Sequence, residues 1–534
     1  MPIAMYESAH IDTFTRDNLP GPGLWPELKF TLPELTYPER LNAAAALLAG
    51  GAPEAPAILW EGGAWTYAEL TVEASRIAHV LTADMGLVPG GRVLLRGRNT
   101  AMMLAAWYGV LLAGGVVVAT MPLLRAPELV TICDKAEITL ALSENNLMDE
   151  LTVAAKLTST KLKVMGFGEE STELEAHMRG KPTEFTPVAT AQDDVALLAF
   201  TSGTTGQPKA CMHFHRDVLI MADTYAAHIV KPRADDVFCG SPPIAFTFGL
   251  GGLVVFPARF GAAVALPSGP SADAFMDTIE RHGVTIIFTA PTAYRAMLGQ
   301  MEGRKLSSLR RCISAGETLP EATYHAWLEA TGLKLMDGIG ATEMIHIFIS
   351  APYDEIRPGS TGKPVPGYEA CVLDDEGTIL TRPATGRLAV KGPTGCRYMA
   401  DERQKTYVQN GWNVTGDTYS QSADGYFTFI ARSDDMIVSS GYNIGGPEVE
   451  AALLAHDAVA ECAVIGVPDA DRGQIVKAFV VTTKDIAGSD ALADELKAHV
   501  KKTIAPYKYP RAITFIHELP KTQTGKVQRF KLRS

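Results

Sequence analysis

The chain has 534 residues, 47% of them apolar and 20% charged, and this composition is typical of a globular protein rather than a disordered one. Its net charge of −12 argues against nucleic acid or an anionic membrane surface as the main partner. The seven cysteines are scattered without a CxxC pair, and the chain begins without a basic stretch followed by an apolar one, so we expect a cytoplasmic protein with reduced thiols and no signal peptide.

Helix-like and strand-like stretches alternate along the part of the chain before residue 434, and this predicts an α/β fold with parallel sheets. The clearest of these are helices over residues 67–82 and 321–332 and strands over 92–96, 284–290 and 309–316.

The uncharged stretch 101–124 is long enough to span a bilayer. However, Gly114 and Gly115 divide it into a helix-like half and a β-branched half. We therefore predict a buried helix followed by a buried strand of a parallel sheet.

The stretch TSGTTGQPKA, residues 201–210, has the composition of a loop that binds phosphate. Backbone N–H groups around Gly203 and Gly206 can form an anion-binding concavity, the hydroxyls add donors, and Lys209 adds charge. The spacing differs from G-x-x-x-x-G-K-[ST], which excludes a P-loop. On composition alone, an ordinary turn rich in Gly and Thr is an equally good interpretation. The HxH pair that follows, His213 and His215, has no third candidate ligand, and we expect both histidines to be structural.

The composition changes near residue 434. Before it lie β-like stretches with several Asp-Gly or Asn-Gly turns, and after it a small unit with the pattern helix, strand, strand, helix, strand. We therefore expect a large α/β body over residues 1–433 and a small α+β domain over residues 434–534. The tail from Lys497 is rich in Lys and Arg with one acid, Glu518, which favours a polyanionic ligand; a solvated basic surface is the alternative.

The string TSGTTGQPK resembles the phosphate loop of the acyl-adenylate-forming superfamily, whose pattern is T-S-G-[ST]-T-G-x-P-K. Further blocks of that family follow in order: GIGATE (338–343), TGD (415–417), ARSDDMI (431–437), SSGYNIGGPEVE (439–450) and LPKTQTGK (519–526). The resemblance covers essentially the whole chain. It implies an N-terminal part with parallel sheets and a distorted β-barrel subdomain, followed by a mobile α+β C-terminal domain that acts as a lid.

The resemblance also implies a reaction in which a carboxylate attacks the α-phosphorus of ATP, pyrophosphate leaves, and a thiol then attacks the acyl-adenylate. The carboxylate is already ionised, so the first step needs no general base; it needs two anions held together and their charge neutralised. Lys526 would bridge the carboxylate and the α-phosphate, Thr342 would hydrogen-bond that phosphate, and Glu343 would be the ligand of Mg²⁺.

The same resemblance implies an ATP/AMP site. Its residues would be Thr201, Ser202, Gly203, Thr204, Thr205, Gly206, Lys209, Gly316, Glu317, Asp337, Gly338, Ile339, Gly340, Thr342, Asp417 and Arg432. Asp417 would accept hydrogen bonds from the ribose hydroxyls, assisted by Arg432, and residues 316–317 and 337–340 would flank the adenine. Ile339 departs from the family pattern, because many relatives have an aromatic residue there.

Asp434 occupies the family's hinge position. Rotation of the C-terminal domain about it would withdraw Lys526 and bring in Ser440, Gly441 and Tyr442 as the CoA-binding loop. Gly441 would let the backbone approach the pantetheine tunnel closely, and the basic tail would face the nucleotide end of CoA.

Within this superfamily, DGIGATEMIHIF (337–348) and the ending from Ala505 resemble benzoate-type aryl-CoA ligases, and the opening SAHIDTFTRDNLPGPGLWPEL is most similar to 2-aminobenzoate (anthranilate)–CoA ligases. The resemblance implies an aryl-acid pocket formed by Phe246, Thr247, Phe248, Gly249, Gly340, His346 and Ile347. The phenyl rings suit a flat substrate ring, and the two glycines would leave room for it. Benzoate ligases tend to carry Ala at the position of Thr247, so its hydroxyl could pair with an ortho amine.

We therefore expect an enzyme that uses ATP, Mg²⁺ and CoA to convert 2-aminobenzoate to its CoA thioester, with a homodimer as the family's plausible assembly. The alternatives are a ligase for benzoate or another substituted benzoate, and an aryl-AMP ligase that loads a carrier protein. A luciferase-like oxygenase and a non-catalytic binder are disfavoured, because nothing indicates oxygen chemistry and both Lys526 and Glu343 are present.

Overall fold

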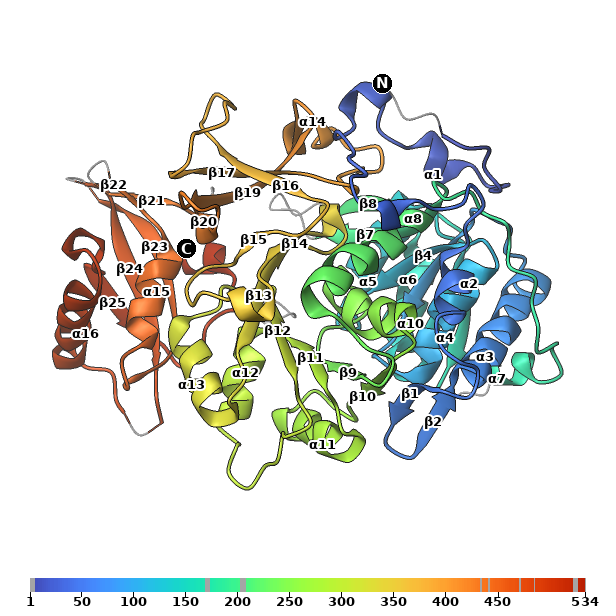
Figure 1. The fold of residues 1–534 in the computed structure, drawn as a ribbon, viewed down its shortest axis with the longest axis horizontal. Coiled ribbons are helices and arrows are strands. Elements are labelled where there is room, and N and C mark those ends of the chain that lie inside the picture. Colours follow the sequence, from blue (N-terminus) through green and yellow to red (C-terminus); the bar gives the residue numbers. More distant parts are fainter. Residues whose placement is uncertain are drawn as a thin grey trace.

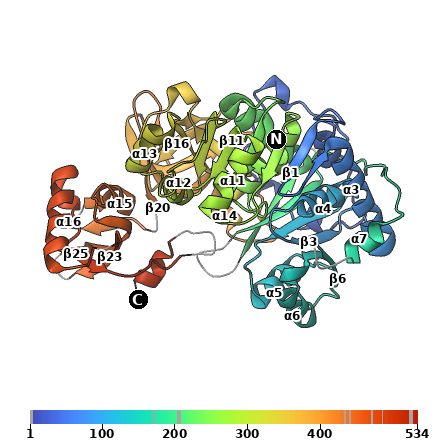
Figure 2. The ribbon, with the colours of Figure 1, turned by 90° about the horizontal axis from the view of Figure 1, so that it is seen from below.

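The computed structural model describes residues 5–168, 173–201, 208–432, 435–439, 442–469, 472–484, 486–521 and 527–533. The body contains two large sheets and a smaller antiparallel one, and the C-terminal elements form a separate lobe, on the left in Figure 1. The view from below in Figure 2 also sets this lobe apart from the body.

The first large sheet has the strand order β6-β5-β3-β4-β7-β8 and is parallel except for its last pair. Its strands are β3 (Arg92–Arg96), β4 (Val116–Thr120), β5 (Leu140–Glu144), β6 (Lys163–Phe167), β7 (Val195–Thr201) and β8 (Lys209–Phe214). The helices around it are α2 (Ala43–Leu48), α3 (Tyr67–His79), α4 (Ala101–Leu112), α5 (Ala126–Lys135), α6 (Met148–Leu157), α7 (Glu173–Met178) and α8 (His215–Met221).

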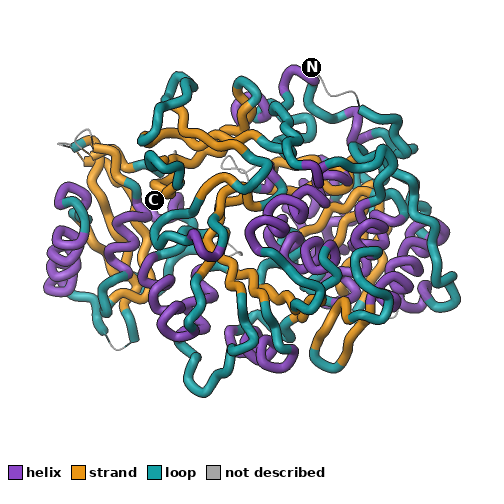
Figure 3. The backbone as a smooth tube through the Cα atoms, viewed as in Figure 1, coloured by secondary structure: helices purple, strands orange, loops and turns teal. Residues whose placement is uncertain are grey.

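Both faces of this sheet are covered, which explains why its strands are apolar without alternation. Val93 and Leu95 of β3 belong to the core cluster that includes α3 and α4, whereas Leu94 belongs to the cluster that includes α5. Figure 3 shows helices around the strands of the body. The predicted helix over 67–82 is confirmed as α3 and a following π-helical segment, Val80–Asp84.

The uncharged stretch 101–124 forms α4 and β4, as predicted. α4 begins after Thr100, whose hydroxyl accepts a hydrogen bond from Met103 N at 3.2 Å, and ends before Gly114, which has φ +71°. Nearly every residue of α4 is buried. Among the residues that the structure describes, no helix combines the length and the apolar character that a bilayer crossing requires.

The second large sheet has the order β15-β14-β13-β12-β11-β9-β10-β1-β2. Its strands are β1 (Pro56–Trp60), β2 (Gly63–Thr66), β9 (Val237–Gly240), β10 (Ala263–Leu266), β11 (Ile286–Thr289), β12 (Arg311–Ala315), β13 (Leu335–Gly340), β14 (Ile347–Ser350) and β15 (Lys363–Pro364). The associated helices are α9 (Thr247–Leu250), α10 (Phe256–Arg259), α11 (Ala272–His282), α12 (Pro291–Leu298) and α13 (Glu321–Thr331). The predicted strands at 284–290 and 309–316 are confirmed as β11 and β12.

The third sheet occupies the place where the resemblance implied a distorted β-barrel. It consists of β16 (Glu369–Leu373), β17 (Ala384–Lys391), β18 (Val408–Gln409), β19 (Trp412–Gln421) and β20 (Phe427–Arg432), with α14 (Gln404–Tyr407) beside it. The described strands are antiparallel in the order β16-β17-β19-β18, with β20 also paired to β19, so the sheet stays open.

The C-terminal lobe contains the hairpin β21 (Ile437–Ser439) and β22 (Tyr442–Ile444), the sheet β23 (Val459–Asp469), β24 (Gly473–Thr482) and β25 (Ala512–Phe515), and the helices α15 (Gly446–Leu454) and α16 (Asp490–Thr503). Its own buried cluster includes Val449, Val464, Leu496 and Val500.

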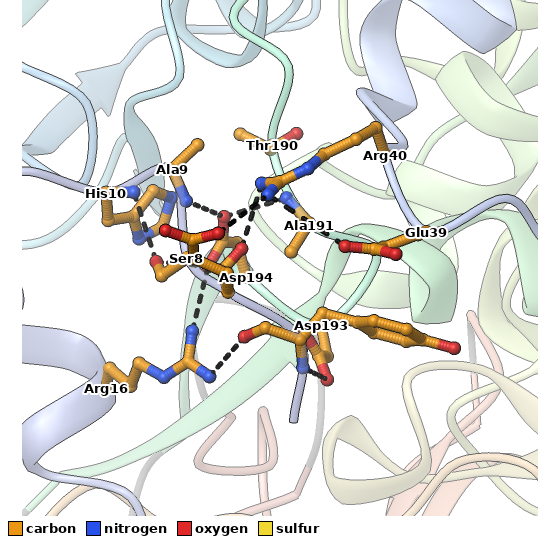
Figure 4. Close-up of polar contacts among 12 residues, drawn as sticks. Ser8, Ala9, His10, Arg16, Glu39, Arg40, Thr190, Ala191, Asp193 and Asp194 are labelled. Carbon is orange, nitrogen blue, oxygen red and sulfur yellow. Dashed lines mark hydrogen bonds and ion pairs between the residues drawn. The ribbon is translucent and has the colours of Figure 1, made fainter. Parts of the chain in front are cut away.

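The N-terminal segment, with α1 (Phe14–Asp17), is fastened to the body just before β7 begins. The Asp194 carboxylate accepts hydrogen bonds from Ser8 Oγ at 2.5 Å and Ala9 N at 3.0 Å, and Asp193 Oδ2 accepts one from Tyr6 N at 3.1 Å (Figure 4). Burial opposes ionisation of Asp194, but these donors and nearby His10 hold its pKa below the ordinary value. We call residues 5–18 the N-terminal clasp.

Candidate active site

The predicted phosphate loop joins β7 to β8 at the edge of the first sheet. Thr201, at the end of β7, lies opposite Lys209, at the start of β8, so the two ends of the loop are held side by side. The loop residues Ser202, Gly203, Thr204, Thr205 and Gly206 lie outside the described residues.

Three side chains of β8, close to the predicted phosphate loop, lie on the same face of the strand. Successive residues of a strand point to opposite faces, so Lys209, Cys211 and His213 share one face. Backbone hydrogen bonds of 2.8 and 2.9 Å join the middle of β8 to residues 397–399. In this pairing Cys211 lies opposite Tyr398, which places Tyr398 diagonally across from Lys209.

A buried ion pair fixes this added strand segment. Arg397 Nη1 lies 2.7 Å from Asp217 Oδ2, and both side chains are fully buried. The same carboxylate oxygen accepts a hydrogen bond from Phe214 N at the start of α8. Burial works against the charged form of Asp217, but Arg397 and Arg216 hold its pKa below the ordinary value.

The side chains of Lys209, Tyr398 and Glu343 form a continuous chain of hydrogen bonds. Lys209 Nζ donates to the Tyr398 hydroxyl at 2.9 Å and lies 4.8 Å from the centre of its ring. The Tyr398 hydroxyl donates in turn to Glu343 Oε1. Tyr398 and Glu343 are both buried.

Thr342 and Glu343 lie on a short 3₁₀ turn, Thr342–Met344, which follows β13. Contacts on both sides hold this turn: His213 Nε2 donates to Thr342 O at 2.8 Å, and Thr394 Oγ1 donates to Met344 O at 2.9 Å. The next residue, the buried Ile345, has φ +66°, a conformation that β-branched residues rarely adopt. The surrounding hydrogen bonds therefore over-determine the backbone beside Glu343.

The two histidines of the HxH pair are held by backbone groups. His213 contacts the Thr342 carbonyl as described, and His215 Nδ1 accepts a hydrogen bond from Ala43 N at 3.1 Å. Burial lowers the pKa of His213 to about 4 and that of His215 to about 3. Within the described residues, no three His, Cys, Asp or Glu side chains come together as a metal cluster.

The donor chemistry of Glu343 fits Mg²⁺, which is bound in proteins by one or two carboxylates while water and phosphate oxygens complete its shell. Oε1 of Glu343 is occupied by Tyr398, and none of the hydrogen bonds given for the described residues uses Oε2. One carboxylate oxygen is therefore left for a cation that arrives with a phosphate group.

Asp417 and Arg432 lie opposite each other on β19 and β20. Arg432 Nη1 lies 3.1 Å from Asp417 Oδ1. Burial raises the pKa of Asp417, and the Arg432 charge offsets part of that effect. The carboxylate is thus oriented by one charged neighbour and can still accept hydrogen bonds from a diol.

The residues expected to flank adenine lie at the ends of β12 and β13. Gly316, with φ +88°, and Glu317 follow β12, and the Glu317 carboxylate accepts a hydrogen bond from Thr292 Oγ1 at 2.5 Å. Burial raises the pKa of Asp337 in β13 to about 7. Ile339 lies opposite Ile349 of β14 and packs against the main core.

Glycines 338 and 340 of β13 are required by close packing. A Cβ on Gly338 would lie 2.9 Å from the Ile347 side chain, and one on Gly340 would lie 2.8 Å from His346 O. These approaches bring the turn after β13 and the start of β14 against the strand.

Phe246, Thr247, Phe248 and Gly249 lie in and just before α9. A Cβ on Gly249 would lie 2.3 Å from Pro243 O, so backbone fills the space beside this glycine. Neighbouring backbone carbonyls therefore already require glycine at positions 249 and 340, and the expectation that these glycines leave room for a substrate ring stays a prediction. Thr247 is buried, and none of the hydrogen bonds given for the described residues uses its hydroxyl.

An aromatic cluster stands beside α9. The His346 ring lies 5.9 Å from the Phe248 ring and 4.7 Å from Phe256, and Phe248 lies 5.5 Å from Phe288. His346 is 3% exposed, and neither ring nitrogen has a hydrogen-bond partner. Burial lowers the pKa of His346 to about 3, which keeps the ring neutral. Ile347, the first residue of β14, is also buried.

Several predicted site residues belong to the C-terminal part of the chain. Lys526, Asp434, Ser440 and Gly441 lie outside the described residues, and Tyr442 begins β22 opposite Ser439. The structure brings Lys209, Thr342 and Glu343 together, and it brings Phe248 and His346 together in a second group.

Sequence reasoning missed Tyr398 and the Arg397–Asp217 pair. The stretch CRYMADE carries no motif of its own and gives no sign of pairing with a strand about 190 positions earlier. The one available signal was that two polar side chains, Arg397 and Tyr398, stand between the apolar Cys396 and Met399.

Two family models match the chain: AMP-binding enzyme over residues 47–398, and AMP-binding enzyme C-terminal domain over residues 448–526. The benzoate–CoA ligase of Thauera aromatica is 36% identical over 515 residues, which cover 94% of this chain and 98% of the relative. The 4-hydroxybenzoate–CoA/benzoate–CoA ligase of Rhodopseudomonas palustris is 33% identical and covers 88% of each chain.

Solved structures match over a similar range. The crystal structure of the anthranilate CoA ligase AuaEII in complex with anthranoyl-AMP has a TM-score of 0.89 at 34% identity, covering 93% of this chain and 97% of that one. A benzoate CoA ligase from Burkholderia xenovorans has a TM-score of 0.82 at 33% identity, covering 92% of this chain and 100% of that one.

Proposed function

The chain belongs to the AMP-binding enzyme family and is an AMP-forming acid–thiol ligase, and we propose that it converts 2-aminobenzoate, through an aryl-AMP, to the aryl-CoA thioester. Both halves of the family model match, and the benzoate ligase of Thauera aromatica aligns over nearly its full length. The general part of this proposal is that the substrate is an aromatic acid, and the specific part is that this acid is 2-aminobenzoate.

The first half-reaction needs a cation between two anions and a place for the pyrophosphate charge. In our proposal Lys526 bridges the acid and the α-phosphate, while Lys209 and Thr342 bind phosphate oxygens. Glu343 would hold Mg²⁺, which neutralises phosphate charge when it is bound. Asp417 would accept from the ribose hydroxyls, with Arg432 keeping its carboxylate oriented.

The second half-reaction needs a different group in the same cleft. We propose that the domain over residues 434–534 rotates about Asp434, so that Lys526 leaves and the loop with Ser440, Gly441 and Tyr442 guides CoA. The separate buried cluster of the C-terminal lobe supports this proposal, because a lobe with its own core can move as a unit.

The preference for 2-aminobenzoate rests on one observation: Thr247 is 8% exposed, its hydroxyl forms no hydrogen bond with another described residue, and its neighbour in the chain, Phe248, belongs to the aromatic cluster with His346. It also lines a small cavity whose other lining residues are apolar, among them Trp107 and Leu197. A buried polar group without a partner costs about 1–3 kcal/mol. A ring amine that supplied the partner would therefore favour 2-aminobenzoate over benzoate by about tenfold or more.

Pyrophosphate release measured over a panel of benzoates, with and without CoA, tests the reaction and the substrate together. We expect release with 2-aminobenzoate and thioester formation only when CoA is present. Release with other benzoates but not with 2-aminobenzoate would contradict the substrate and leave the reaction class intact. Acyl transfer to a carrier protein but not to CoA would contradict the acceptor.

Thr247→Ala tests the proposed determinant. We expect kcat/KM for 2-aminobenzoate to fall about tenfold and that for benzoate to stay within about twofold. An unchanged ratio of the two values would remove Thr247 from the proposal.

A further inference from the structure

The hydroxyl of Tyr398 lies between two groups of opposite charge, Lys209 and Glu343, that the sequence placed in the phosphate and metal sites. We propose that Tyr398 is a positioning residue that separates the loop lysine from the metal-binding carboxylate and so keeps that carboxylate available to Mg²⁺. The inference rests on the proposed roles of Lys209 and Glu343 in binding ATP and its metal.

The position of Tyr398 follows from strand register. Residues 397–399 pair with the free edge of β8, and Tyr398 lies opposite Cys211. Lys209 is two residues before Cys211 on the same face, so the lysine and the tyrosine are diagonal neighbours. The buried Arg397–Asp217 pair fixes this register.

The direction of the hydrogen bonds is determined by the groups themselves. A lysine ammonium can only donate, so the Tyr398 oxygen accepts from Lys209 and its single proton is directed at Glu343. A tyrosine hydroxyl is ordinarily protonated at neutral pH, so this proton is present for Glu343 to accept. The chain therefore has one orientation.

This arrangement replaces a direct ion pair. Among the described residues, no ion pair joins Lys209 to Glu343, although both bond to the same hydroxyl. A direct pair between this lysine and the buried carboxylate would compete with the cation for the carboxylate oxygens. With Tyr398 between them, only Oε1 is used, and Lys209 keeps two of its three protons for phosphate.

A packing role alone does not explain the tyrosine. Its ring makes an edge contact with Tyr407 at 5.7 Å, and a phenylalanine would fill that space equally well. The Tyr407 hydroxyl is buried without a partner, whereas that of Tyr398 contacts both ionic groups. Tyr407 therefore provides a matched control.

The test compares Tyr398→Phe, Tyr407→Phe and the unmodified protein by calorimetric titration with a non-hydrolysable ATP analogue at a series of Mg²⁺ concentrations. We expect Tyr398→Phe to raise the Mg²⁺ concentration for half-maximal nucleotide binding about tenfold, because Lys209 then pairs directly with Glu343. Binding of the analogue without metal should change less than threefold. Tyr407→Phe should match the unmodified protein.

A second substitution separates positioning from a general structural defect. If Lys209 competes for Glu343 in Tyr398→Phe, then adding Lys209→Met should restore the Mg²⁺ midpoint to within about threefold of its normal value, although affinity for the nucleotide falls. Lys209→Met alone should leave the midpoint unchanged. The idea is overturned if Tyr398→Phe has a normal midpoint, or if Lys209→Met does not correct it.

The same measurement covers two remaining cases. If Tyr398→Phe does not fold, a raised midpoint in Lys209→Met alone contradicts the proposal and an unchanged one supports it, because Tyr398 then still holds Glu343. Binding of the analogue needs no turnover, so these outcomes stay interpretable even if no benzoate releases pyrophosphate, the result that would defeat the proposed function instead.

Discussion

Two regions of the predicted site, called here the phosphate wall and the acid wall, differ in how their polar groups are paired. On the phosphate wall, formed by β8, residues 397–399 and the turn 342–344, Lys209, Glu343 and the Thr342 carbonyl all have protein partners. On the acid wall, formed by α9 and the aromatic cluster, both ring nitrogens of His346 are buried without a partner. Single unpaired atoms also occur on the phosphate wall, at Asp217 Oδ1 and Arg397 Nη2, but there each side chain has a charged partner through another atom. His346 differs because it has no partner at all, and buried polar groups are normally paired, so this ring indicates where a ligand could supply one.

The largest effect should come from breaking the support of the phosphate wall. Asp217→Asn leaves the Arg397 guanidinium buried without its counter-ion, and we expect the free energy of unfolding to fall by about 3–5 kcal/mol, measured by urea denaturation. The matched control is Asp494→Asn, which removes the exposed pair with Lys497 and should cost less than about 1 kcal/mol. Equal costs would mean that the buried pair does not hold this wall together.

The next effect concerns chemistry on the same wall. Glu343→Gln keeps the shape but removes the charge, and we expect the rate of pyrophosphate release to fall on the order of 10²–10³-fold. Thioester formation from an added aryl-AMP should change much less, because no phosphate charge develops in that step. Equal losses in both steps would contradict a role confined to the phosphate wall.

On the acid wall, removing a buried polar side chain should not lower the free energy of unfolding, in contrast to the phosphate wall. His346→Leu removes a buried imidazole that has no partner, so we expect the free energy of unfolding to stay equal or rise. The KM for 2-aminobenzoate should rise about tenfold if the imidazole faces the ligand. Lower stability with an unchanged KM would show that His346 belongs to the core.

Near neutral pH, the smallest effect is the dependence of the free energy of unfolding on pH. His213, His215 and His346 have a pKa of about 4, 3 and 3 in the folded chain, against an ordinary value near 6.5. Below about pH 6.5 these histidines are protonated in the unfolded chain but stay neutral in the folded chain. The free energy of unfolding therefore falls as the pH falls. Each ring contributes up to about 1.4 kcal/mol per pH unit down to its folded pKa. Substituting His215 by an apolar residue should reduce the slope of the free energy of unfolding against pH by the contribution of one proton. An unchanged slope would contradict the burial of His215 in its neutral form.

The elements of the body could be predicted where local pattern decides them. The glycine pair at 114–115 and the apolar stretch around it specify α4 and β4 without reference to the rest of the chain. The family motifs likewise singled out Glu343 and Asp417, because their spacing is a property of the sequence, and their roles in binding stay predictions.

Features that depend on packing between distant segments could not be predicted. Tyr398 reaches the site because residues 397–399 add to the edge of β8, and no local pattern specifies that register. The reason for Gly249 was missed in the same way, since the carbonyls that require it become neighbours only after folding. The third sheet is open because β16 and β18 end up apart, which depends on strand order and not on turn residues.

The N-terminal clasp has a consequence for the order in which the chain assembles during synthesis. Its first residues leave the ribosome long before their partners, because Tyr6, Ser8 and Ala9 bond to residues 185–187 positions later. At about 5–20 residues per second, this delay is roughly 10–40 seconds. The strands β3 to β6 are complete by then, so we expect the clasp to close last, over a sheet that has already formed. We therefore expect a tag placed before residue 5 to leave early folding unchanged. It would interfere instead with this final closure, next to β7, the strand that leads into the predicted phosphate loop.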